Sequence, residues 1–131
     1  MYDTVSRFMT KSPYTIGINA TLSEARERMD QQGIRHLPVL DAGALVGLLS
    51  QRDIQLLETF KDVDAKEVKV EEAMSQDVLS VAPQASLAEV AKKMAERKCG
   101  SAVVERKGDV VGIFTTIDAL NALHSLLRRS R

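Results

Sequence analysis

Two strings with the same spacing carry the residues of this sequence that could do chemistry. Residues 47–53 read GLLSQRD and residues 112–118 read GIFTTID, so each has a glycine, two apolar residues, a hydroxyl, two variable residues and an aspartate. Ser50 and Thr115 stand where an apolar run ends and a polar run begins, which is where the N-cap of a helix is expected. An aspartate three residues later would favour the helix dipole. Helix capping is therefore one interpretation of both strings.

The same residues also suit a nucleotide. A carboxylate can accept two hydrogen bonds from the vicinal hydroxyls of a ribose, and a hydroxyl beside the free N–H groups of a helix start suits a phosphate. The candidate ligand contacts are Ser50, Asp53, Thr115 and Asp118. Gly47 and Gly112 would either admit a ligand close to the backbone or ease packing. Because aspartate is shorter than the glutamate of an ordinary capping box, it should reach back to the cap less easily.

The two strings belong to an internal repeat. At a shift of 65 residues (118 − 53 = 65), the sequence aligns with itself without a gap from Val5/Val70 to Leu57/Ala122. The identical pairs are mostly apolar residues, glycines and caps, which set cores and turns. The repeat predicts one fold built twice. Its expected parts are a first unit at residues 1–60, a linker at 61–69, a second unit at 70–127 and a basic C-terminal tail at 128–131.

Each repeat predicts the same order of elements. The segments TLSE and SLAE are capping boxes that start a helix, and apolar residues follow at helical spacing. Two apolar runs around a glycine turn then predict a β-hairpin. A short strand before the first helix and a closing helix after the hairpin complete a β-α-β-β-α unit. The residues expected on the buried helix faces are Leu22, Ala25, Met29, Leu87, Val90, Ala91 and Met94.

The composition narrows the function classes. The 131 residues include 18 Lys and Arg against 18 Asp and Glu, so no overall field attracts nucleic acid or an anionic membrane. No apolar run approaches the roughly 20 residues of a membrane-spanning helix. The single Cys99 cannot form an internal disulfide. We expect a cytoplasmic protein with neither nucleic acid nor membrane among its partners.

No string indicates a catalytic residue or a metal site. His36, His124 and Cys99 have no close metal-ligand spacing. The fingerprints GxGxxG, GxxxxGK followed by a hydroxyl, and GxSxG do not occur in the sequence. We therefore expect that the protein is not an enzyme and has no catalytic cofactor.

The repeat, the GIRHLPV segment at residues 33–39 and the two Gly-x-x-Ser/Thr-x-x-Asp strings closely resemble a CBS-domain pair, the regulatory module named after cystathionine β-synthase. The resemblance covers residues 1–127. It implies an α/β (α+β) fold of two tandem β-α-β-β-α units related by a pseudo-twofold axis.

The resemblance also implies a function. Such a module senses AMP, ADP, ATP or S-adenosylmethionine in clefts between its two units and signals to an effector protein, whose identity the sequence leaves unknown. The family joins two pairs into a disc, so a homodimer is expected. The alternative is a structural dimerisation module with no bound ligand.

In the family, the adenine lies in an apolar slot made by the first strand and the loop before the second strand. The first repeat would supply Tyr14, Thr15, Ile16, Arg35, His36, Leu37 and Pro38. The second would supply Leu79, Ser80, Val81, Ser101, Ala102 and Val103. Family slots often face the opposite unit, which would pair residues 14–38 with Thr115 and Asp118. Arg35 would strengthen a phosphate contact, and His36 would add affinity below about pH 6.5, so we expect the first slot to fill first.

Overall fold

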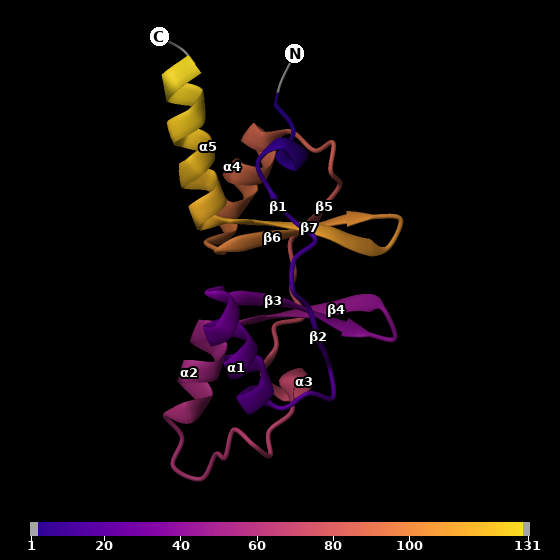
Figure 1. Cartoon of the computed structure of the whole chain (residues 1–131), viewed down its shortest axis with the longest axis vertical. Coiled ribbons are helices and arrows are strands. Elements are labelled where there is room, and N and C mark those ends of the chain that lie inside the picture. The colour runs from indigo at the N-terminus through magenta and orange to yellow at the C-terminus, as the bar shows by residue number, and fades with distance from the viewer. Residues whose placement is uncertain (1–2, 130–131) are drawn as a thin grey trace. The chain divides into compact units, whose positions relative to one another are not determined.

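The computed structural model describes residues 3–129 as two compact units, and each unit is a small sheet with helices on one face (Figure 1). We call residues 14–78 the first-repeat unit, because they contain most of the first repeat. We call residues 3–13 together with 79–129 the second-repeat unit. Each unit has its own hydrophobic core.

The first-repeat unit follows the expected β-α-β-β-α order. Its elements are β2 (Ile16–Gly17), α1 (Leu22–Gln32), β3 (His36–Asp41), β4 (Ala44–Ser50), α2 (Gln51–Glu58) and α3 (Val70–Ala73). The sheet order is β2-β3-β4, with β2 parallel and β4 antiparallel to β3. Gly43 turns the hairpin at a φ of 86°, a conformation that glycine adopts without steric cost. The predicted hairpin and helices are confirmed.

The second-repeat unit repeats this order and adds a strand. Its elements are η1 (Val5–Arg7), β1 (Thr10–Lys11), β5 (Ser80–Val81), α4 (Leu87–Arg97), β6 (Ser101–Arg106), β7 (Asp109–Thr115) and α5 (Thr116–Arg129). The sheet order is β1-β7-β6-β5. Strand β1, which the sequence analysis did not predict, pairs antiparallel with β7. Arg128 and Arg129 of the expected tail form the last turn of α5, and residues 130–131 lie outside the described range.

The segment before each repeat packs into the unit of the other repeat. The Leu22 N–H donates to the Val68 carbonyl (2.9 Å), and the Leu87 N–H donates to the Asp3 carbonyl (2.9 Å). These bonds are equivalent, because 87 − 22 and 68 − 3 both equal 65. Val68 also packs against the first-repeat core, although it lies in the segment expected to be a linker. The compact units are therefore offset from the boundaries of the sequence repeat.

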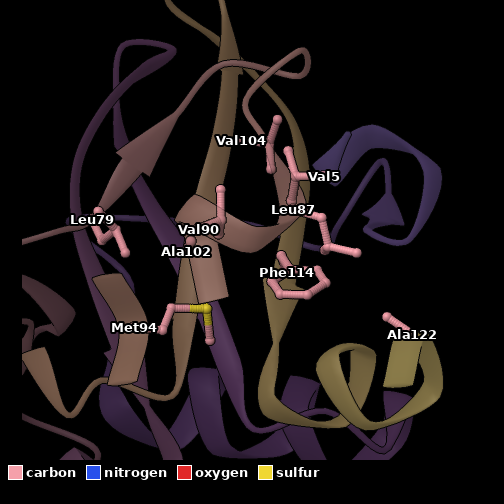
Figure 2. Close-up of a cluster of buried hydrophobic side chains, with 9 residues drawn as sticks. All are labelled: Val5, Leu79, Leu87, Val90, Met94, Ala102, Val104, Phe114 and Ala122. Carbon is pink, nitrogen blue, oxygen red and sulfur yellow. The ribbon is translucent and has the colours of Figure 1, made fainter. Parts of the chain in front are cut away.

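The helix faces predicted to be buried form the two cores, with one exception. Leu22, Ala25 and Met29 of α1 are buried in the first-repeat unit. Figure 2 shows the second core around Phe114, where Leu87, Val90 and Met94 of α4 are buried. Ala91 was expected among them and is instead exposed, because its position on α4 lies over a groove beside α5.

Candidate functional site

Ser50 and Asp53 form a complete capping box at the start of α2. The Asp53 N–H donates to Ser50 Oγ (3.1 Å), and the Ser50 N–H donates to Asp53 Oδ2 (2.8 Å). Capping is therefore a real role of this pair. The second carboxylate oxygen, Asp53 Oδ1, accepts no hydrogen bond from any residue in the range 3–129. It remains an open acceptor, as a ribose hydroxyl requires.

Thr115 and Asp118 make the equivalent box at α5, and the hydroxyls of Thr115 (3.2 Å from Asp118 Oδ2) and Thr10 are additional donors to the carboxylate. The Thr115 N–H donates to Asp118 Oδ2 (2.9 Å), and the Asp118 N–H donates to Thr115 Oγ1 (3.3 Å). The Thr10 hydroxyl lies 3.1 Å from Asp118 Oδ1 and 3.2 Å from Oδ2. Thr10 was missed in the sequence analysis. The available signal was that Thr10 and Ser75 are both hydroxyl residues one repeat apart.

The expectation that aspartate reaches back to the N-cap less easily than glutamate was wrong. Both aspartates reach back to the N-cap backbone, because the short side chain still spans one helical turn. At the earlier caps, Thr21 Oγ1 accepts from the Glu24 N–H (3.2 Å) and Ser86 Oγ from the Glu89 N–H (3.3 Å). The reciprocal bond from the glutamate side chain is not formed there within the described residues.

Gly47 and Gly112 serve packing. A Cβ atom at Gly112 would lie 2.3 Å from Met9 Sδ, and one at Gly47 would lie 2.5 Å from Met74 Sδ. Both distances are far below van der Waals contact, so a side chain at either position would force the methionine to move. The two methionines are themselves one repeat apart, since 74 − 9 = 65. Of the two interpretations of the glycines, the structure favours packing.

His36 and Arg35 stand beside the first capping box. His36 lies directly opposite Ser50 in the hairpin, so their side chains share one face of the sheet. Burial lowers the pKa of His36 below 6.5, Asp53 opposes this shift and Arg35 adds to it. Protonation of His36, and the gain in ligand affinity expected from it, should therefore occur at a pH lower than 6.5. The Arg35 carbonyl accepts from the Gln51 N–H (2.8 Å), which holds Arg35 at the start of α2.

Ser101 occupies the matching position in the second-repeat unit. It lies directly opposite Thr115 in the hairpin of β6 and β7, so the two hydroxyls lie on one face of the sheet. Ser101 is only 3% exposed, and its Oγ has no hydrogen-bond partner within the described part of the chain. A buried polar group without a partner costs about 1–3 kcal/mol. A ligand hydrogen bond at this position would remove that cost.

The other predicted contacts differ in what they can offer a ligand. The side chains of Ile16, Leu37, Leu79 and Ala102 belong to the helix-side cores, which leaves only their backbone groups available. Pro38 and Val103 each follow a core residue on their strand, so their side chains point to the opposite face of the sheet. Both are buried and belong to neither core.

The four remaining predicted contacts are two in each unit, with Tyr14 and Thr15 just before β2 and Ser80 and Val81 in β5. Tyr14 is 51% exposed, and the Thr15 carbonyl accepts from Arg28 Nη1 (2.6 Å). The Ser80 hydroxyl donates to Glu105, and Val81 packs against the second core. Tyr14 therefore has the freest side chain of the four.

Residues 3–129 contain neither a membrane-spanning helix nor a cluster of metal ligands. No helix in that range is long and apolar enough to span a bilayer. No group of three or more His, Cys, Asp and Glu side chains in the same range is arranged to hold a metal ion.

Similar proteins carry the same domain in different settings. The chain is 32% identical to the CBS domain-containing protein YhcV of Bacillus subtilis, over 84% of this chain and 78% of that protein. It is 34% identical to a homoserine O-acetyltransferase of Methanococcoides burtonii, but the match spans 89% of this chain and only 23% of the enzyme. The same domain therefore also occurs within longer enzymes.

A solved structure with the same fold contains ligands. The CBS domain pair of protein MJ0100, in complex with 5′-methylthioadenosine and S-adenosyl-L-methionine, superposes with a TM-score of 0.85 at 26% identity. The match covers 95% of this chain and 98% of that one. The family model described as CBS domain matches residues 5–57 and 70–125. The chain therefore belongs to the CBS-domain family and carries one copy of the domain in each repeat.

Proposed function

We propose that this chain is a non-catalytic regulatory module that binds an adenosine-containing ligand and signals to an effector protein. The observation that carries the proposal is the pair of hydroxyl–aspartate caps, each facing a polar side chain across its hairpin. One of these side chains, Ser101, is buried without a partner among the described residues. Such a site has hydrogen-bonding capacity that a ligand would satisfy.

The chemistry of the caps suits the part that the ligands have in common. AMP, ADP, ATP and S-adenosylmethionine all carry an adenine and a ribose diol. Asp53 offers an open carboxylate oxygen for that diol. Arg35 is exposed at the start of α2 and offers a charge-assisted contact to a phosphate. The proposal therefore covers the whole ligand class, with phosphorylated members favoured near Arg35.

A thermal-shift assay tests the proposal. The wild-type protein is heated with millimolar AMP, ADP, ATP, S-adenosylmethionine or 5′-methylthioadenosine, with GMP and CMP as base-specificity controls. A ligand at about 100 times its dissociation constant raises the free energy of unfolding by roughly 2.7 kcal/mol. For a small domain, this raises the Tm by several degrees. The absence of a shift with all five adenosine compounds would reject ligand sensing and leave the dimerisation alternative.

A homodimer through the second-repeat unit is the second part of the proposal. A groove of about 290 Å³ lies between α4 and α5, and its walls are mostly apolar. Ala119 and Ala122 line it at the positions where the first-repeat unit has Ile54, which is buried, and Leu57, which packs against the core. The groove is therefore open because these two side chains are small.

The occupant that fits this groove is a second copy of the chain. Four residues of α5 are each more than half exposed, namely Ile117, Leu120, Leu123 and Leu127. A twofold axis would place the apolar ridge of each copy against the groove of the other. The first turn of α5 contains Asp118 and its last turn contains Arg128 and Arg129. Antiparallel pairing of two α5 helices would bring opposite charges and opposite dipole ends together.

Light scattering on the purified protein tests the dimer. We expect twice the 14.4 kDa chain mass for the wild type and a single chain mass for Leu123→Lys. Leu56→Lys is the matched control, because Leu56 is exposed on α2 in the other unit. Monomeric wild-type protein, or loss of the dimer in the control alone, would contradict the proposed face.

A further inference from the structure

The Thr10 hydroxyl occupies the position on Asp118 that a diol would use. It lies almost equally far from the two carboxylate oxygens, at 3.1 and 3.2 Å. A hydroxyl between both oxygens covers the edge on which two vicinal ligand hydroxyls would each donate to one oxygen. The Thr115 N–H already donates to Oδ2 (2.9 Å). A diol that binds both oxygens of Asp118 must therefore displace Thr10.

The other repeat lacks this contact. Ser75 is the equivalent of Thr10, since 75 − 10 = 65, and it exchanges two backbone hydrogen bonds of 2.9 Å with Leu48. Its hydroxyl makes no hydrogen bond to Asp53 or to any other described residue. The difference between the two sites therefore lies in the Thr10 side chain, because the backbone pairing is repeated.

Thr10 also begins the segment through which the chain leaves the second-repeat unit. Strand β1 has only two residues, and the first-repeat unit begins at Tyr14. After β1, the Ser12 N–H donates to the Val111 carbonyl (3.1 Å), although Ser12 has a φ of 48°, which is unfavourable for a non-glycine residue. Segment 10–13 is thus held by few bonds, and the bond from Thr10 to Asp118 is one of them.

We propose that Thr10 is a positioning residue that couples occupancy of Asp118 to the anchoring of segment 10–13. When ligand hydroxyls take Asp118, the Thr10 hydroxyl is released to water and the segment loosens. This inference rests on the proposed function, because it assumes that Asp118 binds the ligand. It goes further by naming the contact that the ligand breaks and the segment that responds.

Hydrogen exchange in the ligand-free protein tests the anchor by itself. The Ser12 amide is the reporter, because its acceptor is Val111 O. Loss of one such hydrogen bond should accelerate its exchange about threefold to tenfold in Thr10→Val. Thr10→Ser retains the hydroxyl and should exchange like wild type, as should Ser75→Ala, the matched control in the other repeat. Wild-type exchange in Thr10→Val would overturn the inference, whether or not a ligand is ever found.

The same reporter tests the coupling with AMP and 5′-methylthioadenosine as probes. Saturating probe should accelerate Ser12 exchange in wild type and leave Thr10→Val without further change. Calorimetry should show that Thr10→Val binds the probe several-fold more tightly, because no bond has to be displaced. Binding to wild type without a change at Ser12 would overturn the coupling and leave the proposed function intact. If neither probe binds, the coupling is rejected for these ligands, the thermal-shift assay with all five adenosine compounds decides the proposed function, and the ligand-free experiment decides the anchor.

Discussion

Replacing Asp118 with alanine should destabilise the ligand-free protein more than replacing Asp53. Within residues 3–129, the carboxylate of Asp53 accepts one hydrogen bond, from the Ser50 N–H at 2.8 Å. The carboxylate of Asp118 accepts the equivalent bond at 2.9 Å and also the hydroxyls of Thr10 at 3.1 Å and Thr115 at 3.2 Å. Loss of one hydrogen bond to the carboxylate costs about 0.5–1.5 kcal/mol, and the N-cap residues Ser50 and Thr115 remain in both variants. We therefore expect about 1 kcal/mol for Asp53→Ala and about 2 kcal/mol for Asp118→Ala.

Urea unfolding without ligand measures both losses, with near-UV and far-UV signals compared to detect separate unfolding of the two units. A double-mutant cycle isolates the bond between Thr10 and Asp118, because Thr10→Val removes its donor and Asp118→Ala removes its acceptor. The coupling free energy between Thr10→Val and Asp118→Ala should be about 1 kcal/mol. Equal losses for the two aspartates, or a coupling near zero, would refute this reasoning.

Three further predictions concern pH, packing and ligand choice. Because burial lowers the pKa of His36 in the folded state, the unfolded chain binds the proton at a higher pH than the folded chain does. The free energy of unfolding should therefore fall as the pH drops below 6.5, and urea titrations at several pH values should show a smaller fall for His36→Gln. Gly112→Ala should lower the Tm, and Met9→Ala should cost less in the Gly112→Ala background than in wild type, because the added Cβ would meet Met9 Sδ. Arg35→Met should weaken AMP several-fold in calorimetry and leave 5′-methylthioadenosine, which has no phosphate, unchanged; equal losses would argue against a phosphate contact.

The repeated unit and the residues at the two caps can be predicted from the sequence alone. Capping boxes, helical spacing and strand alternation are written in residues that are neighbours along the chain, so they can be recognised without a structure. Ser50 with Asp53 and Thr115 with Asp118 are separated by one helical turn, and each pair meets as expected. The sequence showed Gly47 and Gly112 but left packing and ligand access as alternatives for them. The packing partner of Gly112 is Met9, which lies more than one hundred residues away along the chain.

The distant segments that complete each unit can be identified only from the three-dimensional fold. Thr10 reaches Asp118 because β1 pairs with β7, and Val68 reaches Leu22 because the chain returns to the first core. A two-residue strand has too short a pattern to be recognised, and the partner of such a strand is set by the path of the whole chain. The burial that lowers the pKa of His36 is likewise a property of its surroundings, since the residue type specifies only the ordinary value.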